Sequence, residues 1–156
     1  MEKFLEYLKT AEDKIQKVDH MIYITFPLIK DKRLLLAILS ELNVIILNIL
    51  NSILQYDYIH KKIALSKDAR ENLETFIQFS SKNYGINEEE IKKILEILDL
   101  GEKHKKSPFE FVKEEKVVIL SENLNPAVVT IEKAKEFLLL EKTILKKVRE
   151  TMRNKV

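Results

Sequence analysis

One apolar stretch constrains the fold more than any other part of the sequence. Residues 34–56, LLLAILSELNVIILNILNSILQY, contain a single charged side chain, Glu41, in a chain that is 33% charged. A segment of this length and apolarity has to be hidden from water, either in a lipid bilayer or at the centre of a helical protein. Its polar residues distinguish between these two environments.

Polar side chains recur through this segment at helical spacing. At about 100° per residue, most of them fall along one narrow stripe with Ser40 at its edge, while Leu and Ile cover the rest of the circumference. The stripe residues are Glu41, Asn48, Asn51, Ser52 and Gln55. A bilayer span would have to bury these groups and Asn43 near its middle at high cost. The stripe therefore predicts the central helix of a soluble protein and no membrane insertion.

The composition favours one helical domain. The chain has 156 residues, with only 2 Gly and 3 Pro, and Leu, Ile, Lys and Glu predominate. We expect residues 1–156 to form a single domain, because nothing in the sequence resembles a flexible linker. The absence of cysteine excludes disulfides and zinc–thiolate sites, and the charged amino terminus lacks the pattern of a signal peptide. We therefore expect a cytoplasmic protein.

The first half of the chain predicts three helices. An apolar face repeats from Lys3 towards Phe26, where Pro27 is expected to end the first helix. Asp31 is placed to cap the central helix, which is expected to reach about Ile63 and to be about 45 Å long. A third helix is expected over residues 68–84, where Asp68 and Glu71 have the spacing of a capping box and Gly85 favours a left-handed stop.

The second half predicts two helices flanking a short β-hairpin. Asn87 and Glu90 repeat the capping-box spacing and open a fourth helix that is expected to fray into GEKHKKSP. Its expected core face consists of Ile91, Ile94, Leu95 and Leu98. Between residues 109 and 129, clusters of β-branched residues predict a hairpin whose two strands are KVVIL and AVVT.

Thr130 is expected to cap the last helix. One side of that helix is apolar, and it comprises Ile131, Ala134, Phe137, Leu138, Leu145, Val148 and Met152. The predicted fold is thus mainly α: a bundle of four to five helices around a long central helix, with the hairpin inserted before the last one.

Motifs for catalysis, cofactors and metals are missing from the sequence. The two glycines form no phosphate-binding fingerprint, and HExxH, DxDxDG and GxSxG do not occur. His20, His60 and His104 lie near the ends of three different predicted helices, without a partner ligand at helical spacing. Glu41 is the best candidate acid or base, because burial on an apolar helix raises the pKa of a carboxyl. No second catalytic group accompanies it, so we predict no enzyme activity, no cofactor and no metal.

Two sets of residues are candidates for binding. The first is the stripe of the central helix, Glu41, Asn48, Asn51, Ser52 and Gln55, which suits an interhelical hydrogen-bond network or a polar seam between subunits better than an exposed face. The second is basic, and it comprises Lys103, His104, Lys105 and Lys106 with Lys146, Lys147, Arg149 and Arg153. Because the net charge is only +2, nucleic-acid binding would depend on such local clusters. A solvated face accounts for the same charges.

The segments DHMIYITFPLIKDKRLLLAIL and HKKSPFEFVKEEKVVILSEN carry a resemblance to a set of small uncharacterised archaeal proteins. The resemblance covers most of the chain and implies no activity. The order of helices around one long apolar helix is also similar to HEPN-type bundles, which commonly dimerise and often act on or beside RNA. HEPN nucleases have an Arg followed four to six residues later by His, and no histidine here has an Arg at that distance. Two functions follow: protein contact as a homodimer, or RNA or DNA binding.

Overall fold

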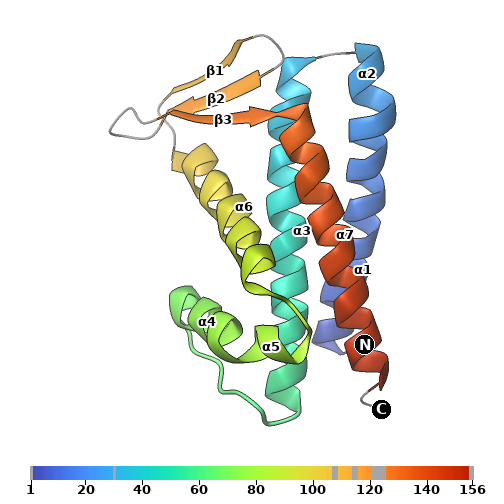
Figure 1. Ribbon diagram of the computed structural model, residues 1–156, viewed down its shortest axis with the longest axis vertical. Coiled ribbons are helices and arrows are strands. Elements are labelled where there is room, and N and C mark those ends of the chain that lie inside the picture. Colours follow the sequence, from blue (N-terminus) through green and yellow to red (C-terminus); the bar gives the residue numbers. More distant parts are fainter. Residues whose placement is uncertain (1, 30, 107–108, 114–115, 121–125, 155–156) are drawn as a thin grey trace.

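We describe the protein from a computed structural model. It covers the backbone of residues 2–29, 31–106, 109–113, 116–120 and 126–154, with their side chains except those of residues 32 and 104–128. The long helices α1 (Lys3–His20), α3 (Lys32–Ile59), α6 (Glu88–Lys106) and α7 (Ile131–Asn154) lie side by side, and α1 begins near the end of the bundle where α7 ends (Figure 1). The mainly α class predicted from the sequence is confirmed.

The first helix does not end at Pro27, contrary to the prediction. Helix α1 (Lys3–His20) continues through a π-helical turn, η1 (Met21–Thr25), into α2 (Phe26–Ile29). In the π turn the Phe26 N–H donates to the carbonyl of Met21, five residues earlier. Pro27 has no N–H, so one ordinary helical hydrogen bond cannot form there. The wider π turn comes directly before this position, and the chain remains helical beyond the proline.

Helix α3 (Lys32–Ile59) is the spine of the fold. Asp31 caps it as predicted, since its carboxylate accepts a hydrogen bond from the Arg33 N–H. It ends four residues before the expected Ile63, because Lys61 adopts a left-handed conformation with a φ of 58°. The Lys62 N–H then donates back to the carbonyl of Asp57 and closes the helix end.

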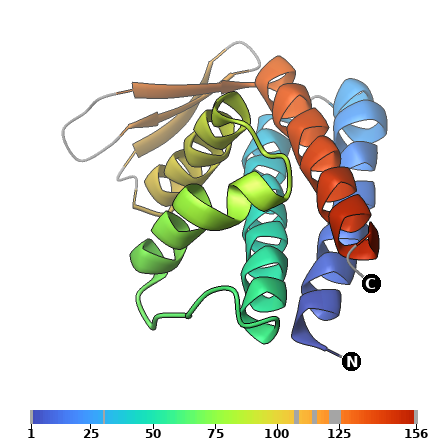
Figure 2. The ribbon, with the colours of Figure 1, turned by 60° about the horizontal axis from the view of Figure 1, so that its bottom comes forward.

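The predicted third helix is present in three segments, α4 (Ala69–Thr75), a π-helical turn η2 (Phe76–Ser80) and α5 (Ser81–Asn83). Together they cross the bundle (Figure 2). Asp68 caps α4 through the Arg70 N–H, while the Asp68 N–H donates to Ser66 rather than to Glu71, so only half of the predicted capping box forms. Gly85 has the predicted left-handed conformation, with a φ of 68°.

Helix α6 (Glu88–Lys106) begins with the predicted capping box. Asn87 accepts from the Glu90 N–H, and Glu90 accepts from the Asn87 N–H. The core face differs from the prediction, because Ile97 and Leu100 are buried with Ile94 whereas Leu95 is 37% exposed. The helix also continues through Gly101 instead of fraying there.

The strands β1 (Phe109–Lys113), β2 (Lys116–Leu120) and β3 (Pro126–Thr130) form an antiparallel sheet in the order β1-β2-β3 at one end of the bundle (Figure 1). The predicted strands KVVIL and AVVT are β2 and part of β3, with Val118 opposite Val128. Thr130 caps the last helix, α7 (Ile131–Asn154), by accepting from the Lys133 N–H. Every residue predicted for the core face of α7 is buried.

Candidate functional site

One side of α3 is closed by other helices. Phe4 of α1 packs edge-on against Tyr56, with ring centroids 5.1 Å apart. Farther along α3, Glu41 accepts a hydrogen bond of 3.0 Å from Lys14, and Lys17 lies 3.7 Å from its other oxygen. The covered side is apolar along its length, and its residues at most 1% exposed are Leu35, Ile38, Leu39, Leu42, Ile45, Ile46, Ile49 and Ile53.

The other side of α3 is partly uncovered. We call it the open lane and define it as Ala37, Ser40, Val44, Leu47, Asn51, Gln55 and Tyr58, all exposed or half-buried. Leu47 is 39% exposed and Tyr58 is 50% exposed. None of the seven side chains is charged. In a chain that is one third charged, an accessible helix face of this kind resembles an interface more than a solvated surface.

The stripe predicted from the sequence is divided between these two sides. Asn51 and Gln55 belong to the open lane, whereas Glu41 turns to the lysines of α1. Ser52 is fully buried and donates to the carbonyl of Ile49, and half-buried Asn48 donates to the carbonyl of Val44. These two side chains therefore bond to their own helix, and among the described residues the only interhelical side-chain hydrogen bond of the stripe is the one that Glu41 accepts from Lys14.

A groove opens beside the open lane, between α3, α4 with η2, and α6. It encloses about 310 Å³, and its wall is mostly apolar. Leu47 and Asn51 belong to both the lane and the groove. The groove is also lined by Asn43, Leu50, Leu54, Arg70, Phe76, Leu98 and Glu102.

Asn43 and Gly101 were not predicted as site residues. Asn43 is only 7% exposed, and its side-chain amide forms no hydrogen bond within the described part of the chain. A methyl group added to Gly101 would lie 2.4 Å from both Cγ and Oδ1 of Asn43. Only glycine, which has no Cβ, therefore allows α6 to approach the amide this closely. The signal available in the sequence was a glycine inside a helical pattern.

The two basic clusters lie at opposite ends of the bundle. Lys103–Lys106 form the end of α6 next to the sheet, while residues 146–153 lie near the carboxyl end of α7 (Figure 1). Lys103 pairs with Asp99 at 3.1 Å, and the side chains of His104, Lys105 and Lys106 are outside the described residues. The structure therefore does not bring the clusters together into one surface.

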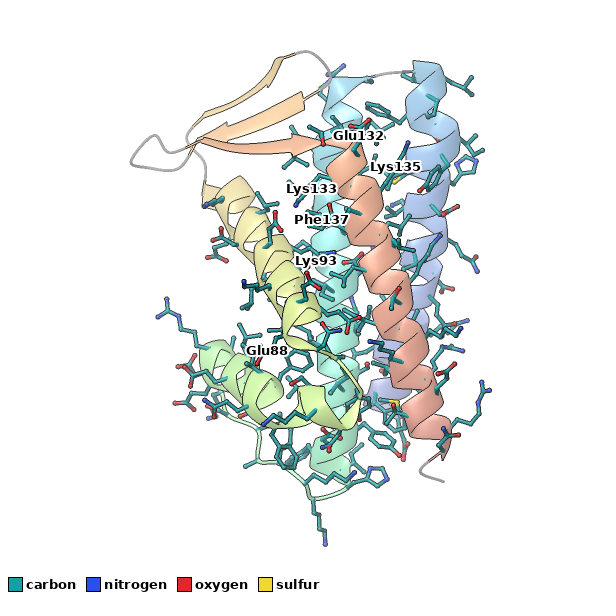
Figure 3. All side chains as sticks on the ribbon, viewed as in Figure 1. Glu88, Lys93, Glu132, Lys133, Lys135 and Phe137 are labelled. Carbon is teal, nitrogen blue, oxygen red and sulfur yellow. The ribbon has the colours of Figure 1, made fainter. Side chains whose placement is uncertain are left out.

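The basic side of α7 is partly neutralised. Lys142 pairs with Asp19, Arg149 with Glu12, and Lys147 with Glu90. Lys146 and Arg153 form no ion pair within the described part of the chain, and both line a shallow hollow of about 300 Å³ with Lys142 and Arg149. On the opposite side of α7, Lys133 pairs with Glu96, and Figure 3 shows Lys93 and Lys133 along the seam of α6 and α7.

Two ionisable groups are perturbed by burial. The pKa of the Tyr84 phenol is raised by burial and by Asp57, whose carboxylate accepts a hydrogen bond of 2.9 Å from it. Burial also raises the pKa of Glu141 well above its ordinary value, and neither carboxyl oxygen of Glu141 has a hydrogen-bond partner among the residues that the structure describes. Neither residue lines the groove or the basic hollow. The sequence signal for Glu141 was its position one heptad after Ala134, on the apolar face of the last helix.

The histidines with described side chains occupy structural positions. The His60 ring stacks on Tyr56 at 4.2 Å and bonds through Nδ1 to the Tyr56 carbonyl oxygen. His20 is exposed and lies 3.3 Å from the hydroxyl of Thr25. Among the described residues, no group of three or more His, Asp or Glu side chains is arranged to hold a metal ion.

One helix, Arg33–Ile59, is long and apolar enough to cross a bilayer. Half of its most apolar window is buried inside the fold, and the core helix of a soluble protein meets the same criteria. Comparison with protein-family models, with curated proteins and with solved structures gave no match to the chain.

Proposed function

We propose that this protein is a non-catalytic interaction protein that forms a homodimer by packing the open lane of α3 against the same lane of a second copy. The observation that carries the proposal is the accessible, uncharged face on the helix that forms the centre of the fold. The proposal includes a cytoplasmic location without membrane insertion, supported by the polar residues along α3 and by the helices that cover its other side.

The spacing of the open lane favours a helix as its partner. From Ala37 to Tyr58 the lane residues follow one another at steps of three and four. Contact residues of two helices that pack knobs into holes have the same spacing. Because none of these side chains is charged, two identical lanes meet without like-charge repulsion.

The order of residues along the lane favours an antiparallel pair of α3 helices. A two-fold axis through the middle, beside Leu47, places each residue opposite another lane residue. Small Ala37 then faces large Tyr58, and Ser40 faces Gln55, so volume and polarity match. The two copies of Leu47 meet near the axis.

The size of the lane sets the expected affinity. From residue 37 to residue 58 an α-helix rises about 32 Å, and with a width of about 10 Å the lane covers on the order of 300 Å². A stable interface usually buries about 800 Å² per partner. We therefore propose a reversible dimer in the weak, transient class, to which neighbouring surface of α4 and α6 contributes.

Sedimentation velocity over a range of protein concentrations tests the dimer. The wild-type protein should shift from monomer to dimer as its concentration rises, and Ser40→Glu should stay monomeric because it buries an unpaired carboxylate opposite Gln55 of the second copy. Gln16→Glu is the matched control, since it adds the same charge to an exposed position on α1. A wild-type protein that stays monomeric at the highest concentrations would contradict the proposal.

Binding of RNA or DNA is a second candidate function. The supporting observation is the hollow on α7, where Lys142, Lys146, Arg149 and Arg153 lie on one side of the helix and the charges of Lys146 and Arg153 are unpaired within the described part of the chain. Such a surface contacts phosphates without reading sequence. The cluster at Lys103–Lys106 lies too far away to extend the same surface.

Fluorescence anisotropy with a labelled single-stranded RNA at several salt concentrations tests this candidate. The double variant Lys146→Glu and Arg153→Glu should weaken binding and lower the slope of log K against log salt by roughly 1.4, or about 0.7 for each lost phosphate contact. The double variant Lys9→Glu and Lys82→Glu, at exposed positions outside the hollow, is the control. Wild-type protein that fails to bind at low salt would exclude this function.

A further inference from the structure

Asn43 is an unusual residue at the base of the groove. Asn43 is only 7% exposed, and it lines the groove. Its amide has no hydrogen-bond partner within the described part of the chain. Because Asn43 lines the groove, its amide is open to a molecule that enters there. A ligand that bonds to this amide would displace no hydrogen bond within the described part of the chain.

Gly101 indicates that the position of the amide is built into the fold. Glycine is less favourable than alanine in a helix interior, so its presence at residue 101 is explained by the close approach of α6 to the Asn43 amide. At this position any Cβ would collide with the Asn43 amide. The glycine of α6 and the asparagine of α3 therefore form one unit that holds a donor and an acceptor at the base of an apolar groove.

The chemistry of the groove defines the ligand. Its apolar wall, formed by residues such as Leu50, Phe76 and Leu98, suits a hydrocarbon body. The Asn43 amide offers both an acceptor and donors, so its complement is another amide. A charged head group would lose its hydration in exchange for a neutral partner, which is unfavourable in an apolar site. Arg70 and Glu102 contribute opposite charges to the lining, so no net charge favours an ionic ligand.

We propose that this groove binds a small, uncharged molecule in which an apolar chain or ring carries an amide group that pairs with Asn43. The volume of about 310 Å³ lies at the lower end of the range for small-molecule sites, about 300–1,000 Å³. The groove shares Leu47 and Asn51 with the open lane, so its ligand binding is tested in protein that is kept monomeric.

Two-dimensional NMR of the full-length protein tests the site, with octanamide as the probe and octanoate as its charged counterpart. The measurement uses the Ser40→Glu variant, because this substitution is expected to prevent the proposed dimer. Ser40 does not line the groove, so the substitution leaves the binding site unchanged. Octanamide should shift the side-chain amide resonances of Asn43 and bind at least tenfold more tightly than octanoate. Equal binding of the two probes, or no shift at Asn43, would overturn the proposal.

Three variants separate recognition from folding. Asn43→Leu keeps the approximate volume and removes the hydrogen-bonding groups, so octanamide affinity should fall about tenfold; Gly101→Ala should weaken it by displacing the amide. Asn48→Leu is the matched control, because Asn48 is on the same helix, bonds to Val44 and does not line the groove. If Asn43→Leu remains folded and binds octanamide as the wild type does, the amide is not the recognition group.

Discussion

The two sides of α3 differ in how far the rest of the fold covers them. The closed side is lined by Leu and Ile at near-zero exposure and meets α1 through the Phe4–Tyr56 contact. The open lane carries small, apolar and amide side chains that are accessible to solvent. The closed side should account for stability and the open lane for association. Substitutions on each side test this division.

The largest expected difference is between two neighbouring apolar residues. Ile49 is fully buried on the closed side, and Ile49→Ala should lower the free energy of unfolding by about 2–5 kcal/mol through lost burial and a cavity. Leu47→Ala, on the open lane, should lower it by less than about 1 kcal/mol in the monomer. Urea unfolding at low protein concentration measures both, and similar losses would erase the distinction between the two sides.

Helix α7 buries the carboxyl group of Glu141, which forms no hydrogen bond within the described part of the chain. Because its carboxyl is buried without a hydrogen bond, Glu141→Leu should raise the free energy of unfolding at pH 7 by about 1–3 kcal/mol. Glu132→Leu, at an exposed position of the same helix, is the control. A loss of stability in Glu141→Leu would mean that the carboxyl has a favourable partner in solution.

The raised pKa of Glu141 also predicts a dependence on pH. Between the pKa of the unfolded chain, about 4.3, and the higher pKa of the folded state, the folded protein keeps a proton that the unfolded chain has lost. Stability contributed by this protonated group should therefore fall with rising pH, by about 1.4 kcal/mol per unit within that window. Relative to Glu141→Gln, wild-type protein should lose stability on moving from pH 5 to pH 7.

The smallest expected effect concerns the ion pair at the edge of the closed side. The Glu41 side chain is 20% exposed and that of Lys14 is 30% exposed, so Glu41→Gln should cost at most about 1 kcal/mol. The cost should shrink in 1 M salt because the charges are screened. A loss of several kcal/mol in thermal or urea unfolding would give Glu41 a larger role than this surface pair.

Local signals in the sequence predicted the elements well. Caps at Asp31, Asn87 and Thr130, and the left-handed stop at Gly85, depend on residues a few positions apart. Pro27 misled the prediction because a π turn before it allows the helix to continue. In these cases the information needed is local, or lies within one helical turn.

Tertiary packing limited the prediction of the candidate site. The polar stripe of the central helix was visible in the sequence, but its assignment to the closed side or the open lane depends on where α1 and α6 lie. Glu41 and Asn51 fell on opposite sides for this reason. The importance of Asn43 likewise depends on Gly101, which is 58 residues away in sequence.

Cross-linking at the centre of the open lane is the most direct test of the proposed homodimer. The chain has no cysteine, so Leu47→Cys introduces a single thiol at the proposed two-fold axis, where the two copies should approach within disulfide distance. Mild oxidation should convert this variant rapidly into a covalent dimer, and adding Ser40→Glu should suppress the reaction. Gln16→Cys, at an exposed position on α1, is the control. If Leu47→Cys cross-links no faster than Gln16→Cys, the open lane is not the dimer contact.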